Sequence, residues 1–471
     1  MLGVESSMTA DESLLTRPKD VNDNQQLFRI QTDINTDNTQ FSIKGLNYAS
    51  QYASLYFVRL NLLRPRVLAA AQKRWSTVSS LPQHVPRVVD VQTGVLCYII
   101  GTVFLDMSEK PNILDEVSRE EWTALPTPKN KYVSEKDAVL LEDESGRIVL
   151  TGDIIKTTVF MTGVIAALLG SENQEGEFQV LDVCYAAFDP QPPLPISTDS
   201  DHPWIALVSG LNFEGDGQYD MRYELLRDFL TGESGTFQDQ LKISHISRLV
   251  ICGNTMAQLH VSAETLQKAK LKFHGPDPNE YNEWVVDTVD QFLVSVGQSM
   301  PVDVVPGATD PTTSFLPQQP IHSSIFHSAC NLTSLSMVTN PYTATVGGTS
   351  ILVDAGQSLD DMYKMTNVAE GVDLASEVLK WGHVAPTAPD TLPCYPFSQN
   401  DPMVITVRPH LYIIGNQTKF DTKVIELCGD GEPTLETTRV ILVPSFSNTG
   451  TVVLVNLATL DYKTVEFGTC I

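Results

Sequence analysis

The stretch VDVVPGATDPTTSFLPQQP, residues 302–320, has the form of a strand that delivers a catalytic loop. Its apolar, β-forming residues run into Pro306 and Gly307, and polar residues that could do chemistry follow at once. Four other apolar runs end in a similar glycine-containing turn: ALVSGLN, ICGNTMA, LVDAGQSLDD and YIIGNQTKF. Strands that end at one edge of a sheet present side chains for catalysis, so these five turns are the candidate site.

A two-metal hydrolytic centre needs anionic and imidazole ligands from several strand ends, around two ions about 4 Å apart. The usual ligand motifs are Asp-x-His, Gly-Asp-x-x-Asp, Gly-Asn-His-Asp, a lone His before Gly, and Gly-His-x-His. In chain order, the corresponding positions of this sequence are Gly210, Asn212, Asn254, Ala257, Ala308, Thr309, Ala355, Asn416 and Thr418. Every aspartate and histidine of the ligand motifs is replaced at these positions.

The remaining polar groups are a poor ligand set. The amides of Asn212, Asn254 and Asn416 are neutral, so they neither offset two divalent cations nor favour deprotonation of a bound water. Asp310 survives beside the third turn, but one carboxylate does not make a two-metal centre. We interpret His322 and His327 as ordinary loop residues. The sequence therefore predicts a degenerate site with no catalytic residue, cofactor or metal, and leaves open whether an ion persists near Asp310.

Composition limits the function classes. The chain has 471 residues, enough for two or three domains, and its 57 acidic against 31 basic residues give a net charge of −26. DNA binding draws on phosphate-facing cations, so we expect little direct contact with nucleic acid and favour a protein partner. No apolar run approaches the roughly 18 residues of a membrane helix, and the start lacks the pattern of a signal peptide. Seven scattered cysteines indicate a reduced, intracellular compartment.

The amino-terminal half divides into four segments. Residues 1–44 are acidic and polar, which predicts a mobile segment. Residues 45–80 form a helical segment with a kink or restart at Pro65. Short β-like runs separated by glycine turns over residues 81–190 favour a small barrel, with the OB-fold as the natural candidate. Residues 191–201 are proline-rich and then acidic, which is typical of a linker.

Residues 202–471 alternate apolar strands with helices or loops, so this part belongs to the α/β class. We expect strands in PWIALVSG, SRLVICGN, VDVVPG, TSILVDAG, HLYIIGN, RVILVPSF and TVVLVNL. Helices are expected over residues 263–273 and 282–297.

Several segments together resemble one protein family. They are VDVVPGATDPTTSFLPQQP, MVTNPY (337–342), VAPTAPDTLPCYPF (384–397), QYASLYFVRL, VLLEDESGRIVLTG and GNQTKF (415–420). In order and spacing they are similar to the small, B-type subunits of replicative DNA polymerases, most closely the second subunits of the delta enzymes. The likeness covers residues 45–471.

The resemblance implies a calcineurin-like phosphoesterase β-sandwich with flanking helices that has lost its activity over residues 202–471, joined to an OB-fold. It also implies a nuclear, non-catalytic scaffold in DNA replication and repair synthesis. One surface would bind the C-terminal cysteine-rich module of the catalytic subunit. Another would hold the third subunit, and contact with the sliding clamp would be indirect. Neither the interface residues nor their regulation can be named from the sequence.

Three alternatives stay open at this stage. The first is an active metal-dependent phosphoesterase or nuclease, related to the small subunit of the archaeal D-family polymerase. The second is the B-type subunit of another replicative polymerase, although those subunits carry a longer, differently built amino-terminal region. The third is a single-strand DNA binder that stacks bases on Tyr98, Phe104 and Phe160 of the barrel.

Overall fold

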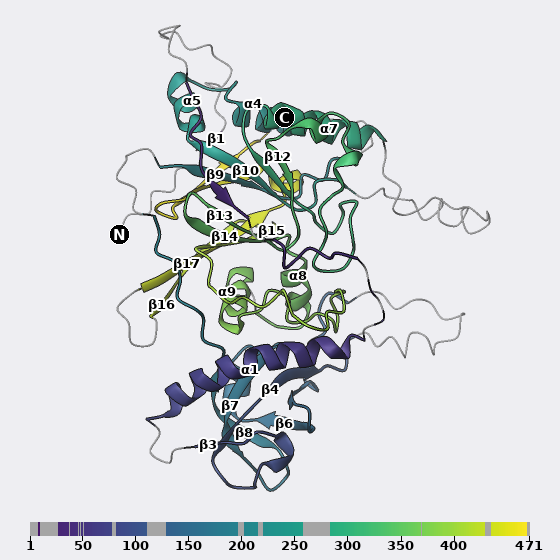
Figure 1. Cartoon of the computed structure of the whole chain (residues 1–471), viewed down its shortest axis with the longest axis vertical. Coiled ribbons are helices and arrows are strands. Elements are labelled where there is room, and N and C mark those ends of the chain that lie inside the picture. The colour runs from purple at the N-terminus through teal and green to yellow at the C-terminus, as the bar shows by residue number, and fades with distance from the viewer. Residues whose placement is uncertain are drawn as a thin grey trace, which may run out of the picture. The chain divides into compact units, whose positions relative to one another are not determined.

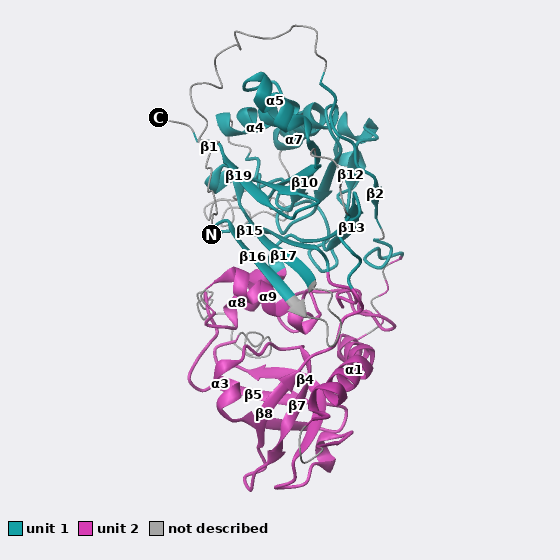
Figure 2. Cartoon of the chain, turned by 90° about the vertical axis from the view of Figure 1, so that its left-hand side faces the viewer, with its two compact units in different colours: residues 1–44, 191–357, 409–471 teal, residues 45–190, 358–408 magenta. Residues whose placement is uncertain are grey.

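The computed structural model describes most of the chain, as two compact units that each combine separate stretches of sequence. The described residues are 8–9, 27–36, 38–45, 47, 49, 51–77, 82–110, 129–195, 202–214, 220–257, 283–368, 370–428 and 435–468. Unit 1 comprises residues 1–44, 191–357 and 409–471, and unit 2 comprises residues 45–190 and 358–408, as coloured in Figure 2. The helix expected at 263–273 lies outside the described residues.

Unit 1 contains two mixed sheets. The first is ordered β1 (Met8–Thr9), β19 (Tyr462–Glu466), β18 (Thr451–Asn456), β9 (Trp204–Val208), β10 (Ile246–Cys252), β11 (Val302–Val305) and β12 (Leu335–Met337). The second is ordered β16 (Asp421–Cys428), β17 (Leu435–Pro444), β15 (Leu411–Gln417), β14 (Thr349–Asp354), β13 (Tyr342–Val346) and β2 (Ile34–Asn35). All seven strands expected after residue 202 are present.

Strand β9 shows how the layers of unit 1 are built. Its side chains alternate between the two faces of the sheet, as the period of a strand requires. Ile205 and Leu207 share a core with Val353 of β14 and Ile413 of β15, so the two sheets pack face to face. Ala206 and Val208 contribute to the core on the opposite face of the first sheet.

That opposite face is covered by α4 (Met221–Thr231), α5 (Phe237–Ser244) and α7 (Glu283–Gly297) (Figure 1). Helix α7 confirms the helix expected at 282–297. Its buried residues Val285, Val289, Leu293 and Val296 recur at helical spacing and form one apolar stripe. A short helix, α10 (Phe446–Thr449), follows β17.

The expectation of a mobile amino-terminal segment is wrong for the part of it that the structure describes. Strand β2 pairs with β13 and forms one edge of the second sheet, and Phe41 is buried. The half-buried guanidinium of Arg29 donates hydrogen bonds to the carbonyls of Leu230 (2.7 Å), Ile243 (3.1 Å) and Ile246 (2.7 Å). It therefore ties together the ends of α4 and α5 and the start of β10, because backbone carbonyls at helix ends lack intrahelical donors.

Unit 2 contains a closed five-stranded barrel. Its strands follow the order β4 (Cys97–Asp106), β5 (Ala138–Glu142), β6 (Arg147–Thr151), β8 (Phe178–Cys184) and β7 (Ile165–Glu172), and β7 pairs with β4 to complete the circle. Strand β3 (Gln83–His84) also pairs with β4. The short helix α3 (Asp153–Thr157) lies between β6 and β7 in sequence.

Helix α1 (Ala53–Trp75) covers one side of this barrel. Leu63, Val67 and Trp75 of the helix share a core with Tyr98 of β4 and Ala167 of β7. The helix does not restart at Pro65, since it is continuous through this residue. Pro65 is exposed, and so is Asn61, whose carbonyl loses its donor. Water can therefore satisfy that carbonyl while the buried face holds the helix together.

Residues 358–408 were expected in the carboxy-terminal domain but group with the barrel. They contain most of α8 (Gln357–Lys364) and all of α9 (Gly371–Trp381). One contact that links them to α1 is the buried ion pair between Arg59 and Asp401. No helix in the described ranges combines the length and the apolar character needed to cross a bilayer.

Candidate functional site

The five turns predicted to form a site do converge, at the carboxyl ends of β9, β10, β11, β14 and β15. The backbone N–H of Gly210 donates to the Gly253 carbonyl over 2.9 Å, which joins the first two turns. A Cβ atom added at Gly253 would lie 2.7 Å from the Ala355 Cβ and 3.2 Å from the Gly307 Cα. Four of the turns therefore contact one another through backbone and small side chains.

Asn416, at the end of β15, brings in the fifth turn. Its side-chain Nδ2 donates to the carbonyls of Ala355 (2.8 Å) and Cys252 (3.2 Å), and its backbone N–H donates to the Ser209 Oγ over 2.9 Å. Its Oδ1 atom is buried without a hydrogen-bond partner among the described residues. The Asn416 amide thus cross-links strand ends from both sheets.

The other two asparagines also hold loops. Asn212 Nδ2 donates to the Ser447 Oγ over 3.1 Å, and its backbone N–H donates to the carbonyl of Asn254 over 2.9 Å. Asn254 Oδ1 accepts the backbone N–H of Thr309 over 3.3 Å. The side-chain amides at these predicted ligand positions therefore serve the protein's own hydrogen bonding.

Asn212, Asn254 and Asn416 share an unusual backbone conformation, with φ of 44°, 54° and 57°. Asparagine adopts this left-handed region at lower cost than other non-glycine residues. We interpreted the three residues only as replaced ligands. The recurrence of asparagine directly after an apolar strand was a signal for a left-handed turn that the sequence analysis missed.

Asp310 lies in the same loop but is turned into the protein. Its carboxylate is buried and accepts the backbone N–H groups of Met256 (2.9 Å) and Gly307 (2.8 Å), with further backbone hydrogen bonds from Thr255 and Asn254. Burial raises the pKa of the Asp310 carboxyl, and these hydrogen bonds limit the rise. Four donors use the acceptor sites of one carboxylate, so Asp310 has the geometry of a loop-stabilising residue.

The remaining predicted positions lie at the periphery. The side chains of Ala308 and Thr418 are exposed, and Ala257 is half-buried with its N–H donated to the Phe213 carbonyl. His322 and His327 are exposed, and His322 Nδ1 lies 2.6 Å from the Ser324 Oγ. Among the residues that the structure describes, no three His, Cys, Asp or Glu side chains are grouped closely enough to hold a metal ion.

The barrel aromatics considered for base stacking are not available as a platform. Tyr98 and Phe160 are 5% and 7% exposed. Tyr98 packs against Trp75, with ring centroids 5.1 Å apart, and Phe104 is half-buried with the Lys110 ammonium 5.5 Å from its ring centroid. Tyr98 and Phe160 therefore belong to the core of unit 2.

Comparisons with known proteins connect both units to one family. Residues 51–183 match the family model described as the DNA polymerase delta subunit OB-fold domain. Residues 205–422 match the family model that describes the B subunits of DNA polymerases alpha and epsilon. The first match agrees with the barrel predicted over residues 81–190.

Full-length relatives are similar over nearly the whole chain. The chain is 36% identical to the DNA polymerase delta small subunit of Saccharomyces cerevisiae, over 91% of each protein. It is 35% identical to the Arabidopsis thaliana small subunit, over 94% of this chain and 97% of the relative. It is 33% identical to DNA polymerase delta subunit 2 of Drosophila melanogaster, over 93% of this chain and 98% of the relative. The chain belongs to the family of DNA polymerase delta small subunits.

Proposed function

We propose that the chain is a non-catalytic accessory subunit of the DNA polymerase delta holoenzyme. It acts as a scaffold that bridges the C-terminal cysteine-rich module of the catalytic subunit and the third subunit. Its contact with the sliding clamp is indirect, through the third subunit. It works in the nucleus, in DNA replication and repair synthesis. The relatives that match along almost the entire chain support the assignment to this complex.

One observation supports the non-catalytic role above all others. The polar side chains at the strand ends form hydrogen bonds within the protein itself. Asn416 and Asn254 bond to backbone groups of neighbouring turns, and the Asp310 carboxylate accepts four backbone N–H groups. A hydrolytic metal pair needs anionic ligands that face a shared open position. We infer that unit 1 is a calcineurin-like phosphoesterase fold whose reaction has been lost. The two facing mixed sheets with helices on the first support this inference.

Charge supports a scaffold over a nucleic-acid binder. The net charge of −26 repels a phosphate backbone over most of the surface. The barrel lacks exposed stacking residues at Tyr98 and Phe160. We therefore expect the chain to bind proteins rather than nucleic acid.

Coexpression with the catalytic and third subunits tests the proposed function. We expect one complex that contains all three chains in size-exclusion chromatography and native mass spectrometry. We also expect the other two subunits to separate when this chain is omitted. A folded chain that associates with neither subunit would overturn the proposal.

A hydrolysis assay tests the inactive site separately. We expect no cleavage of single-stranded DNA or of a model phosphodiester in the presence of Mn²⁺, and no stoichiometric transition metal by elemental analysis. Manganese-dependent cleavage that disappears in Asp310→Ala, with that variant still folded, would favour the enzyme alternative. No contact among the described residues of unit 1 favours that alternative.

A further inference from the structure

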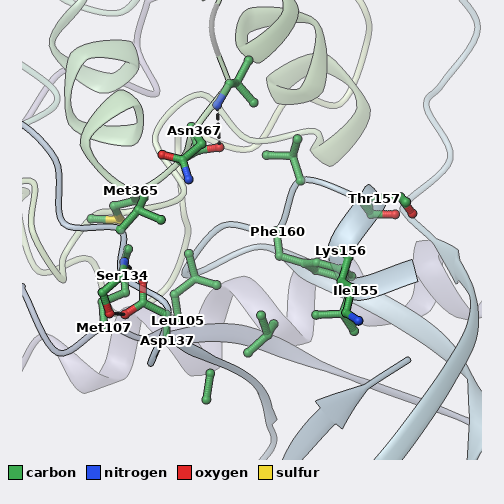
Figure 3. A pocket seen from close by; sticks show the side chains of 17 residues that line it. Leu105, Met107, Ser134, Asp137, Ile155, Lys156, Thr157, Phe160, Met365 and Asn367 are labelled. Carbon is green, nitrogen blue, oxygen red and sulfur yellow. Dashed lines mark hydrogen bonds between the residues drawn. The ribbon is translucent and has the colours of Figure 1, made fainter. Parts of the chain in front are cut away.

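Unit 2 contains a groove that the proposed function does not use. It has a volume of about 420 Å³ and lies beside the barrel. Its walls come from the end of β4, the start of β5 with the residues before it, α3 with the segment that follows, and residues 365–368 after α8 (Figure 3). All of these residues belong to unit 2. The groove is large enough for one or two side chains of a bound segment.

The walls of the groove combine aliphatic side chains with polar ones such as Thr157, Thr158 and Asn367. Val133, Val139, Ile155, Val159 and Val368 line it, and each of them is half-buried rather than buried. Covering apolar surface stabilises a complex by about 25 cal/mol per Å² of area removed from water. A ligand with an apolar side chain would therefore gain free energy by filling this groove.

Two charged residues lie on opposite sides of the groove in Figure 3, and they differ in availability. Asp137 accepts hydrogen bonds from the Ser134 backbone N–H (2.7 Å) and from the Ser134 Oγ (2.8 Å), so each of its oxygens has one partner within the protein. Lys156 is exposed, and its ammonium makes no ion pair or hydrogen bond with the described residues. The groove therefore offers aliphatic side chains beside one exposed ammonium group that pairs with no described residue.

This combination discriminates between ligand classes. Among the lining residues, Lys156 is the one cation, and Phe160 is 7% exposed, so neither a phosphate track nor a stacking surface is present. Asp137 is the one carboxylate of the lining, and one carboxylate is too few ligands for a metal ion. A nucleic acid and a metal ion both fit this site poorly.

We propose that the groove binds an extended acidic peptide segment of another subunit of the polymerase. An aliphatic or aromatic side chain of that segment fills the groove, and a neighbouring Asp or Glu carboxylate pairs with Lys156. The identity of the partner rests on the proposed function, whereas the chemistry of recognition rests on the groove itself. The net charge of −26 repels an acidic peptide at long range, so the segment is held only where its apolar side chain and carboxylate act together.

Tiled peptides of the catalytic and third subunits, labelled for fluorescence anisotropy, test the proposal against the intact chain. We expect binding of peptides in which Asp or Glu neighbours Leu, Ile, Val or Phe. Lys156→Glu should weaken this binding by about tenfold or more, because it removes the ion pair and adds repulsion. Lys136→Glu is the matched control, since Lys136 is an exposed lysine that does not line the groove. It should change the affinity less than about twofold.

A second variant examines the apolar wall without a change of charge. Val159→Thr keeps the shape of the side chain and should weaken binding several-fold. Equal binding of peptides whose carboxylates are replaced by amides would overturn the proposal, as would equal binding to Lys156→Glu and the parent. Competition by a DNA oligonucleotide, or concentration-dependent self-association lost in Lys156→Glu, would overturn it in favour of another occupant. If the three-subunit complex forms while no peptide binds, this inference fails and the proposed function stands.

Discussion

The guanidinium Nε of Arg59 lies 2.7 Å from the Asp401 Oδ2, and both side chains are fully buried. The same guanidinium donates to the carbonyls of Gly163 (3.2 Å), Pro386 (2.8 Å) and Ala388 (2.7 Å). One side chain of α1 therefore joins the barrel to the segment that enters unit 2 from the later part of the chain. A buried pair of this kind is costly to break, because removal of one partner leaves the other charge uncompensated.

Arg59→Ala should lower the free energy of unfolding by about 3–5 kcal/mol, since it leaves the Asp401 charge and three carbonyls without their donor. Urea unfolding followed by fluorescence measures the loss. Arg64→Ala is the control, because Arg64 pairs with Glu144 at the surface and its removal should cost less than about 1 kcal/mol. Equal losses in both variants would contradict a structural role for the buried pair.

The His383 imidazole makes stability depend on pH. Burial and the Arg59 charge lower the pKa of His383, while Asp401, 2.9 Å away, opposes this shift. A histidine whose folded pKa is lowered contributes stability above its unfolded pKa of about 6.5, and this contribution is lost as the pH falls. We expect a loss of up to about 2 kcal/mol between pH 7 and pH 5. His383→Gln should show a smaller loss, whereas an unchanged pH profile would contradict the assignment.

Asp401 causes a second loss of folding stability at lower pH. Burial opposes ionisation of this carboxyl, but the hydrogen bonds from His383 and Arg59 and the charge of Arg59 hold its pKa well below the usual value. The stability it provides is therefore complete above about pH 4 and is lost on further acidification. Asp401→Asn, followed by urea unfolding, should remove this second phase.

Arg29→Ala should destabilise unit 1 by about 2–3 kcal/mol, because the cation bonds carbonyls at the ends of two helices. Hydrogen exchange should show faster opening of α4 and α5. Arg147→Ala, which removes an exposed guanidinium of β6, should leave both exchange and unfolding almost unchanged. If Arg29→Ala were as stable as Arg147→Ala, the hydrogen bonds of Arg29 would not contribute to the stability of unit 1.

Gly210→Ala should cost more than a glycine substitution in open space. Its φ is 58°, and an added Cβ would lie 2.8 Å from the Ser445 Cβ and 2.9 Å from the Asn416 Oδ1. Gly176 has a φ of 80° with no atom within 4 Å of the added Cβ, so Gly176→Ala reports backbone strain alone, about 1 kcal/mol. An equal loss of stability in the two variants would mean that the strand ends move apart to accommodate the added Cβ at position 210. A larger loss at Gly210 implies that an aspartate at this position would also strain the turn.

Asp310→Ala should destabilise the protein by several kcal/mol, because four buried backbone N–H groups lose their acceptor. Thermal unfolding of the parent should be the same with and without a chelator. A chelator-induced fall in the melting temperature of the parent, absent from Asp310→Asn, would instead indicate a bound ion.

Periodic elements were predictable from local sequence. The apolar spacing of α7 gave its position to within one residue, and the strands of unit 1 follow from short apolar runs that end in turns. The convergence of Gly210, Asn254 and Asn416 also follows, because strands of one layered unit end at a common edge. The helix and the strands depend on local residue patterns, whereas the convergence depends on the strand layout that those patterns imply.

Long-range partners were not predictable in this way. Arg59 occupies an ordinary position of an amphipathic helix, and its acceptors lie more than 100 residues away. Arg29 binds backbone carbonyls of two helices, and every residue has such a carbonyl, so the sequence does not identify these acceptors. The inward direction of Asp310 depends on backbone N–H groups of a loop about 55 residues earlier.

Unit 2 is built from two stretches of the chain that are far apart in sequence, and this affects its folding during synthesis on the ribosome. Arg59 and Asp401 are separated by 342 positions, so α1 and the barrel strands leave the exit tunnel long before the carboxylate that neutralises the arginine. Until Asp401 has been synthesised, the Arg59 guanidinium therefore remains solvated and unit 2 cannot complete its buried ion pair. Most of unit 1 is translated during this interval. A fragment that stops at residue 190 should accordingly behave as an incomplete folding intermediate rather than as an independent module.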